Sequence, residues 1–406
     1  MDRGRGNAGA QALKHVLSLA TLFPNAEDPR FGPFVAKSLE ALASRGDWKV
    51  TVVNPIGIPP VAFGKYRPLA ALDPVSQERG MVVHRPRFML IPRFGPRFNA
   101  NAIARAVTPL IRQIHAETSI DLLDAEFFFP DGPAAAQIAE AIGLPLSIKA
   151  RGSDITYWGT HEFAKEQMLA AAENASALLA VSQNLAGEMT ALGMDASKIT
   201  VHYTGLDRDR FRPLNHTGLR ATLAGELSFE IPDGAPLLCS VGALVERKGH
   251  AFAIEALGQL ADARLIIVGK GEDDAILRAL ASELGVAERV LLAGSVDHDL
   301  MPVILSASDV MVLPTRAEGL ANAWVEALAC GTPVVTCDVG GARELINSEI
   351  AGRLVPREVD AIVAAVRAIL AHPPSPQAVA ATVERFSWEN HAAELAAHFE
   401  RVSAAD

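Results

Sequence analysis

The stretch VMVLPTRAEGLANAWVEALACGTPVVTC, residues 310–337, contains the unit from which the fold can be predicted. It starts with an apolar run at 310–313, passes through a loop into a helical stretch, and ends in a second apolar run at 334–337. We expect the helix to begin near Ala321 and to end at Gly331, because glycine commonly closes a helix. Two apolar runs joined by a helix are typical of a βαβ unit with parallel strands.

The same alternation extends over nearly all of the 406 residues. One helix is predicted from Pro33 to Gly46, with proline at its first position. Prolines and glycines then interrupt the pattern between residues 207 and 236. We therefore expect an α/β protein with two doubly wound domains, 1–206 and 207–386. Strands are predicted at 15–20, 50–54, 122–128, 146–149, 178–182, 237–241, 265–268, 290–292, 310–313, 334–337 and 353–355.

Composition narrows the class of protein. The formal net charge of −10 argues against a nucleic-acid partner, which would favour a basic chain. The cysteines Cys239, Cys330 and Cys337 form no CxxC pair and are predicted to be buried, reduced side chains. No run of eighteen apolar residues occurs, so no membrane span is expected, and the N-terminal apolar run is interpreted as a strand rather than a signal peptide.

Candidate site residues follow the predicted strands of the second half, where doubly wound sheets bind ligands. Glu318 lies in the loop before the helix and Glu326 inside it. Unpaired amides at the helix start favour an anion such as a diphosphate. Arg247 and Lys248, after the strand at 237–241, could offset its charge. Alternatively, the acids are ordinary exposed side chains and the two cations a solvated turn. The predicted amide contacts are Gly319, Leu320, Ala321 and Asn322.

A dehydrogenase is a weaker interpretation. Val268-Gly269-Lys270-Gly271 opens like a dinucleotide-binding fingerprint, but Asp274 occupies the position of the third glycine.

Together these segments resemble the retaining GT-B glycosyltransferases, specifically glycosyltransferase family 4. The resemblance covers most of the chain and includes the acids Glu318 and Glu326 with seven residues between them. It also includes the following AxxCGTPVV run. The further matching segments are VGxLVxxKG at 241–249, IIVGxG at 266–271, LxGxV at 292–296, GGxxE at 340–344, KITVHYTGLD at 198–207 and FRP at 211–213.

The resemblance implies fold, roles and reaction. It implies two Rossmann-like domains that face each other across a cleft, the first binding the acceptor and the second the nucleotide sugar. The last helix, within 387–406, would return to the first domain. Glu326 would hold the ribose, Glu318 the donor sugar, Lys248 the diphosphate, and the Val296 backbone the base. Gly242 and Gly269 are further predicted contacts of the nucleotide sugar. Transfer would proceed with retention and with no metal or cofactor.

Three departures from the family pattern stand out. Ala243 occupies a position where arginine is frequent, and Arg247 is expected to supply that charge. Of the paired glycines usual in a first-domain loop, only Gly32 is present, and the resemblance implies that it contacts the nucleotide sugar. Arg151 replaces a histidine that contacts the donor sugar; it cannot act as a base, but it could hold a phosphate or an acidic group. A structural role of Ser153 or Asp154 as a helix cap is the alternative for that loop.

The segment 79–116 differs from the acidic remainder of the chain. It contains seven arginines, no acidic residue, and interleaved apolar side chains such as Phe88 and Phe98. Such a segment favours an anionic membrane surface or a lipid-linked acceptor that carries phosphate. The alternative is an acceptor loop and helix without any lipid contact.

We therefore expect a cytoplasmic hexosyltransferase that uses a UDP- or GDP-sugar donor and a glycan or lipid-linked acceptor in bacterial surface polysaccharide biosynthesis. Peripheral contact with the inner face of the cytoplasmic membrane is part of this expectation. The alternatives are a nucleotide-sugar epimerase or hydrolase of the same fold, and an inactive GT-B binding module.

Overall fold

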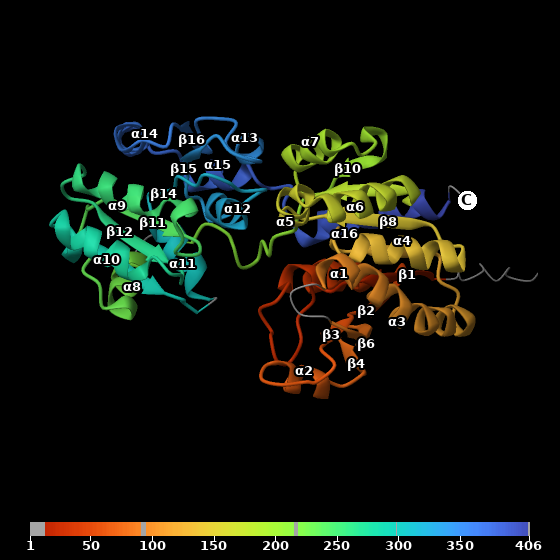
Figure 1. Cartoon of the computed structure of the whole chain (residues 1–406). Helices are drawn as coiled ribbons and strands as arrows, with labels where there is room; N and C mark the ends of the chain where they lie inside the picture. Colours follow the sequence, from red (N-terminus) through yellow and green to blue (C-terminus); the bar gives the residue numbers. More distant parts are fainter. Residues whose placement is uncertain (1–12, 91–94, 215–217, 298, 405–406) are drawn as a thin grey trace, which may run out of the picture. The chain divides into compact units, whose positions relative to one another are not determined.

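The computed structural model describes residues 13–90, 95–214, 218–297 and 299–404, which form two compact units (Figure 1). The first unit contains the described residues up to Ala180, together with Glu188–His202 and the residues from His391 onward. The second contains Val181–Gly187 and Tyr203–Asn390. Each has a largely or wholly parallel sheet with helices, so the predicted class of two Rossmann-like α/β domains is confirmed.

The main sheet of the first unit has the strand order β10-β9-β8-β7-β1-β2-β5-β4. All pairs are parallel except β4 with β5, which form an antiparallel hairpin. The strands are β1 (Lys14–Leu19), β2 (Trp48–Val53), β4 (Val75–Glu78), β5 (Met81–His84), β7 (Leu122–Ala125), β8 (Leu146–Ala150), β9 (Ala177–Ala180) and β10 (Ile199–Val201).

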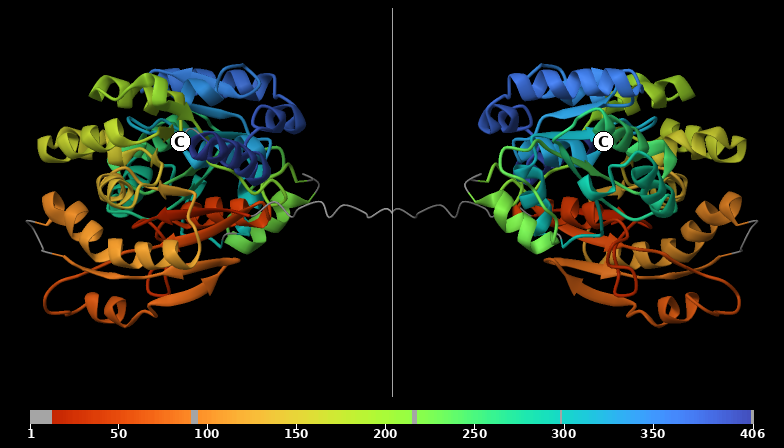
Figure 2. Two further views of the ribbon diagram at one scale, coloured as in Figure 1. Left: turned by 90° about the vertical axis from the view of Figure 1, so that its right-hand side faces the viewer. Right: turned by 90° about the vertical axis from the view of Figure 1, so that its left-hand side faces the viewer.

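The helix predicted from Pro33 is α1 (Pro33–Ser44), and its apolar stripe is buried against the sheet. Helices α3 (Pro96–Glu117) and α4 (Asp131–Ile142) lie side by side (Figures 1 and 2). The other helices of this part of the chain are α2 (Tyr66–Ala71), α5 (Ser153–Thr156), α6 (Glu162–Asn174) and α7 (Gln183–Leu192).

Several short strands were not predicted. A two-stranded parallel sheet joins β3 (Ile56–Ile58) to β6 (Arg87–Met89), and the β4–β5 hairpin and β10 were also missed. Each has only three or four residues, and β4 has no fully buried side chain. An apolar periodicity cannot become visible over so few residues, so the sequence carries little signal for them.

The second unit has one parallel sheet with the order β13-β12-β11-β14-β15-β16, and all six predicted strands are present. They are β11 (Leu237–Val241), β12 (Arg264–Val268), β13 (Val290–Gly294), β14 (Val310–Leu313), β15 (Val334–Cys337) and β16 (Gly352–Val355). The helices are α8 (Leu219–Leu227), α9 (His250–Gly258), α10 (Asp274–Glu283), α11 (Leu300–Ala307), α12 (Asn322–Ala329), α13 (Ala342–Leu345), α14 (Val359–Ala371) and α15 (Pro376–Ala381).

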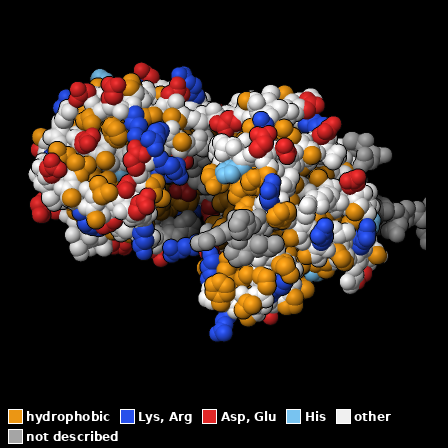
Figure 3. All heavy atoms as spheres, viewed as in Figure 1, with side chains coloured by type: hydrophobic (Ala, Val, Ile, Leu, Met, Phe, Trp, Pro, Cys, Tyr) orange, Lys and Arg blue, Asp and Glu red, His pale blue; other side chains and the backbone are white. Residues whose placement is uncertain are grey.

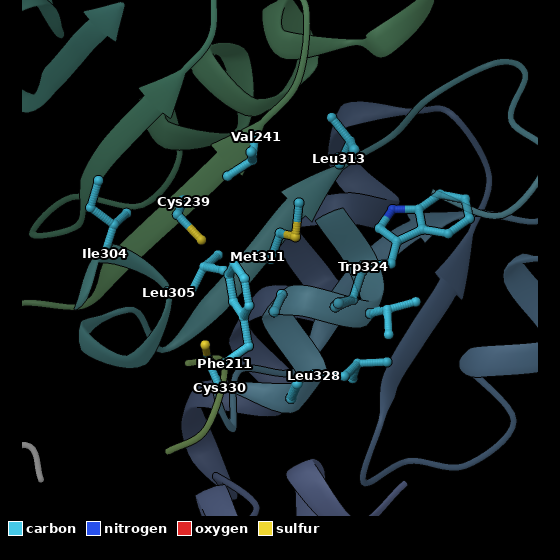
Figure 4. Close-up of a cluster of buried hydrophobic side chains, with 14 of the residues drawn as sticks. Phe211, Cys239, Val241, Ile304, Leu305, Met311, Leu313, Trp324, Leu328 and Cys330 are labelled. Carbon is cyan, nitrogen blue, oxygen red and sulfur yellow. The ribbon is translucent and has the colours of Figure 1, made fainter. Parts of the chain in front are cut away.

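This sheet has one apolar cluster on each face. Successive residues of β12 alternate between them, with Ile266 in one cluster and Ile267 in the other, as strand geometry requires. Trp324 of α12 lies fully buried in the first cluster, together with Cys239 and Cys330 (Figure 4). All three cysteines are free and buried, as predicted.

The last helix, α16 (Trp388–Ser403), belongs to the first unit from His391 onward. Phe399 packs edge-on against Trp48, with 5.7 Å between the ring centroids. His398 Nε2 lies 3.0 Å from the hydroxyl of Ser147 in β8. Across the described ranges, no helix is both long and apolar enough to span a bilayer.

Candidate active site

In the loop after β11, the side chain of Lys248 lies close to the backbone of Gly242. Gly242 follows the strand, and a Cβ atom there would lie 3.5 Å from Cδ of Lys248. Gly249 has a φ of 78°, and a Cβ atom on it would come within 2.4 Å of the Pro314 carbonyl oxygen, so only glycine fits. His250 braces the loop, because its ring contacts the Ser240 hydroxyl at 2.9 Å and the Ala243 carbonyl at 3.2 Å.

Lys248 reaches the carboxylate of Glu318, which lies in the loop after β14. The Nζ atom donates to Oε1 of Glu318, and both side chains are nearly buried. The hydroxyl of Thr315 also donates to that oxygen, at 3.2 Å. Arg247 approaches the same atom at 3.4 Å but is about half exposed. The structure thus brings together three of the predicted residues, and Thr315 is an addition that sequence reasoning missed.

The segment after Glu318 rests on a pair of glycines from the loop after β15. Gly340 has a φ of 54°, and a Cβ atom there would lie 1.8 Å from the Glu318 carbonyl oxygen. The amide of Gly341 donates to the Gly319 carbonyl at 2.6 Å. Within the described chain, no acceptor is recorded for the amides of Gly319, Leu320, Ala321 and Asn322. This segment therefore presents free donors at the start of α12, where an anion is favoured.

Glu326 lies one turn inside α12 and is half-buried. Burial raises its pKa to about 7, against the attraction of Arg210. Among the described residues its carboxylate has no recorded hydrogen bond or ion pair. A carboxylate held in this way can accept hydrogen bonds from a polar ligand.

The remaining predicted contacts of the nucleotide sugar in the second unit are Gly242, Gly269 and Val296. A Cβ atom on Gly269 would lie 1.8 Å from the Gly242 carbonyl oxygen, so these two loops pack backbone to backbone. Val296 follows β13 and is half-buried against the apolar cluster that contains Trp324.

Glu344 has a supporting role. Its carboxylate accepts hydrogen bonds from the amides of Gln183 and Asn184, at 2.9 and 3.0 Å, and from the Tyr203 hydroxyl at 2.7 Å. Burial and this hydrogen bond raise the pKa of Tyr203 to about 12. In the GGxxE segment, Gly340 and Gly341 therefore contact the loop that carries Glu318. Glu344 binds the backbone of residues 183 and 184 and the hydroxyl of Tyr203, also in the second unit.

In the first unit, Gly32 and Arg151 lie near the first turn of α1. Gly32 has a φ of 68°, and a Cβ atom there would lie 2.6 Å from the Leu22 carbonyl oxygen. The Arg151 guanidinium lies 5.0 Å from the ring centroid of Phe34. Asp154 accepts from the amides of Arg151, Gly152 and Phe128, so its role is structural. The predicted use of Ser153 or Asp154 as a helix cap is wrong, because α5 begins after Gly152 and no side chain caps it.

A buried charge cluster around Arg151 was not predicted. Arg151 and Lys149 both pair with Glu126, which is fully buried at the end of β7. Asp124, two residues earlier, is also fully buried, and burial together with the charge of Glu126 raises its pKa to about 8. The signal in the sequence was the presence of acids within an apolar strand, at 124 and 126.

The arginine-rich segment 79–116 borders a cavity of about 780 Å³ between β6 and the first half of α3. Met89 and Phe98 line it and are exposed by 62% and 50%, and the exposed Arg105 lies at its edge. Figure 3 shows hydrophobic side chains gathered with basic ones over this part of the first unit. Arg93, within the same segment, lies outside the described residues.

Comparison with known proteins identifies the class. Two protein-family models match this chain. The family model described as "Glycosyltransferase Family 4" matches residues 34–210, and the family model described as "Glycosyl transferases group 1" matches residues 227–386. Sucrose-phosphate synthase from Thermosynechococcus elongatus superposes with a TM-score of 0.74 at 21% identity, over 97% of this chain and 100% of that chain. The structure of Anabaena HepE in complex with UDP superposes with a TM-score of 0.72 at 20% identity, over 96% of this chain and 100% of that chain.

Two curated relatives extend the comparison. A protein named as a teichuronic acid biosynthesis glycosyltransferase from Bacillus subtilis is 27% identical over 86% of this chain and 88% of its own length. The 2-deoxystreptamine glucosyltransferase of Streptomyces kanamyceticus is 33% identical, but over only 43% of this chain and 48% of its own length.

The two domains and these matches define a glycosyltransferase of the GT-B type. The chain belongs to the glycosyltransferase family 4 type, as its sequence resemblance predicted.

Proposed function

We propose that the protein transfers a hexosyl unit from a UDP- or GDP-sugar to a glycan or lipid-linked acceptor. The observation that carries this proposal is the contact of Lys248 with Glu318 beside the free amides of residues 319–322. One cation and several aligned donors favour a diphosphate, and a neighbouring carboxylate favours a sugar diol. The solved complexes of HepE with UDP and with UDP-glucose are consistent with such a donor.

Each residue of this site receives a role in the proposal. The bond between the anomeric carbon and the diphosphate oxygen breaks while an acceptor hydroxyl forms a new bond to that carbon. Negative charge grows on the leaving diphosphate, which takes up the proton of the hydroxyl. Lys248, Arg247 and the amides of Gly319 and Leu320 stabilise that charge. Glu318 accepts from hydroxyls of the donor sugar, and Glu326 accepts from the ribose. The base lies at Val296, against the backbone of Gly242 and Gly269.

We propose further that transfer retains the anomeric configuration and requires no metal. Lys248 and Arg247 supply the positive charge that a divalent cation would otherwise bring to the diphosphate. Gly32 and Arg151, in the first unit, complete the predicted set of contacts to the substrates.

The proposed acceptor belongs to bacterial surface polysaccharide biosynthesis and lies in the first unit. The cavity beside Met89, Phe98 and Arg105 combines an apolar lining with a cation, which suits an acceptor that carries a lipid and a phosphate. The protein would then act in the cytoplasm, in peripheral contact with an anionic membrane surface.

Thermal unfolding with candidate donors tests this function. A ligand that binds only the native state raises the melting temperature, so UDP or GDP and the matching sugar nucleotide should stabilise the protein. Detection of transferred sugar on an acceptor then separates a transferase from the epimerase or hydrolase alternative, whose products lack that linkage. If no nucleotide diphosphate or sugar nucleotide stabilises the protein, the inactive binding module becomes the better interpretation.

A further inference from the structure

Hydrogen bonds fix Arg151 at the carboxyl end of β8, but they do not occupy all of the donors of its guanidinium group. Its Nε atom donates to the Glu126 carbonyl at 2.7 Å, and its Nη2 atom donates to the Glu126 carboxylate. Its amide is bound at 3.0 Å by Asp154. The side chain is only 5% exposed. Within the described residues, Nη1 has no recorded acceptor, so one edge of the guanidinium fork is free.

Buried ionisable side chains surround Arg151. Glu126 keeps its charge, because Lys149 and Arg151 lower its pKa although burial favours the neutral acid. Asp124 is raised to a pKa of about 8 and is therefore mostly neutral near pH 7. Glu126 is thus shared by Arg151 and Lys149, and Lys149 Nζ, 3.6 Å from Glu126, has no hydrogen bond within the described chain. A further anion next to the free edge would be stabilised.

Arg151 lies at the edge of the sheet where a ligand is expected to bind. The ends of β7 and β8 are neighbours at the carboxyl edge of a parallel sheet, where doubly wound domains bind ligands. Phe34, at the start of α1, flanks the guanidinium and limits its movement. The positive end of the α1 dipole adds to the attraction for negative charge.

We propose that Arg151 binds an anionic group of a substrate, a carboxylate or a phosphate, through its free Nη1 edge. Glu126 and Asp154 are positioning residues, since they fix the guanidinium and the backbone from which it extends. This inference rests on the proposed function and narrows its substrate class. Either the donor carries an acidic sugar, or the acceptor carries a phosphate.

Calorimetric titration with two probes distinguishes the sources of the anion. The first probe compares UDP-glucuronate with UDP-glucose, which differ by the carboxylate on the sugar. The second is inorganic phosphate, titrated while saturating UDP occupies the diphosphate site. The parent should either prefer UDP-glucuronate by about tenfold or more, or bind phosphate in the presence of UDP. The first result assigns the anion to the donor, the second to the acceptor.

Three variants complete the test. Arg151→Gln should remove the preference or the phosphate binding seen in the parent, while Arg151→Lys should keep part of it, because lysine keeps the charge but lacks the fork. Arg45→Gln is the matched control, since Arg45 pairs with Asp47 on the surface of the same unit at 2.5 Å. It should behave like the parent. Should Arg151→Gln fail to fold, as circular dichroism would show, the comparison of Arg151→Lys with the parent decides.

The inference is overturned if the parent shows neither the preference nor phosphate binding, or if the Arg151 variants leave them unchanged. Binding of UDP alone is measured throughout. If UDP or GDP binds normally while the anion has no effect, only this inference fails; if neither UDP nor GDP binds to the parent, the proposed function fails as well.

Discussion

The Nζ atom of Lys248 donates to Oε1 of Glu318 across 70 positions of the sequence. The contact joins the loops after β11 and β14, which are neighbouring strands of the second sheet. Both side chains are nearly buried, at 13% and 11% exposure, so their charges are less screened than those of a surface pair. A diphosphate would compete with Glu318 for the lysine and would release the carboxylate for hydroxyls of the sugar.

The first prediction concerns Lys248. Lys248→Met should lower turnover about a hundredfold, because a donor aimed at the developing charge is lost. Steady-state kinetics on the identified donor measure the effect. Arg316→Gln is the control, since Arg316 lies in the same loop as Glu318 but pairs with the exposed Glu246 at 2.8 Å. Equal losses in both variants would indicate general damage to the loop rather than a role of the lysine.

The second prediction concerns metal ions. Because charge stabilisation is assigned to Arg247, Lys248 and backbone amides, turnover should persist in excess EDTA. The measurement is the initial rate of sugar transfer before and after chelation, with and without added magnesium or manganese. A complete loss that either ion restores would contradict the metal-free mechanism.

Much of this site could be predicted from the sequence because its residues lie in long, regular units. Glu318 and Lys248 each follow a short strand of five residues or fewer. Each strand nevertheless belongs to a βαβ repeat, and the carboxyl ends of all the parallel strands lie at the same edge of the sheet. The repeat thus predicts that both residues lie at one edge of the sheet, whereas the adjacency of β11 and β14 is a lateral order that the repeat does not contain.

The cluster of Glu126, Lys149 and Arg151 could not be predicted in the same way. Its pairing depends on the lateral order of β7 and β8 and on full burial of the charges, and neither has a local pattern. The β3–β6 pair was missed for a related reason, since two strands of three residues far apart in sequence carry almost no periodicity.

The third prediction follows from Glu326, whose pKa burial raises to about 7. If the ionised carboxylate accepts from the ribose, binding of the nucleotide favours the charged form, so affinity falls as the pH falls through 7. Between pH 8 and pH 6 the ionised fraction changes about tenfold, and the Kd for UDP or GDP should rise by a similar factor. Calorimetry at constant ionic strength measures it.

Glu326→Gln is the control for this pH dependence. It removes the titrating group, while the ionisation of the nucleotide itself is unchanged. The slope should therefore be smaller in the variant than in the parent. Identical slopes would show that the nucleotide alone titrates, and that Glu326 is not its partner.

The fourth prediction concerns the surface beside α3. Arg97 and Arg105 with Met89 and Phe98 combine positive charge and exposed apolar area, so the protein should co-sediment with phosphatidylglycerol vesicles, less so at high salt. The double variant Arg97→Glu, Arg105→Glu should weaken this binding and leave the affinity for UDP or GDP unchanged. Arg45→Glu, at the end of α1, is the control. An absence of vesicle binding by the parent at low salt would defeat the membrane assignment.

The last prediction separates the two glutamates of the second unit. Glu326 is assigned to the ribose, so it should contribute to binding of the free nucleotide diphosphate and of its sugar conjugate alike. Glu318 is assigned to the donor sugar, so it should matter for the conjugate and little for the diphosphate. A charge-assisted hydrogen bond contributes about 1.5–3 kcal/mol, hence about ten- to more than a hundredfold in Kd.

Titration of Glu326→Gln and Glu318→Gln with both ligands gives four measurements. We expect Glu326→Gln to weaken both ligands, and Glu318→Gln to lower turnover and to weaken only the conjugate. The contact of Glu318 with Lys248 makes one further outcome informative. Loss of the carboxylate frees the lysine, so the Glu318→Gln variant could bind the free diphosphate more tightly than the parent while it binds the conjugate less tightly. Such opposite changes cannot arise from misfolding, which weakens both ligands. If both variants bind both ligands like the parent, neither acid contacts the donor and the assignment of the donor site is wrong.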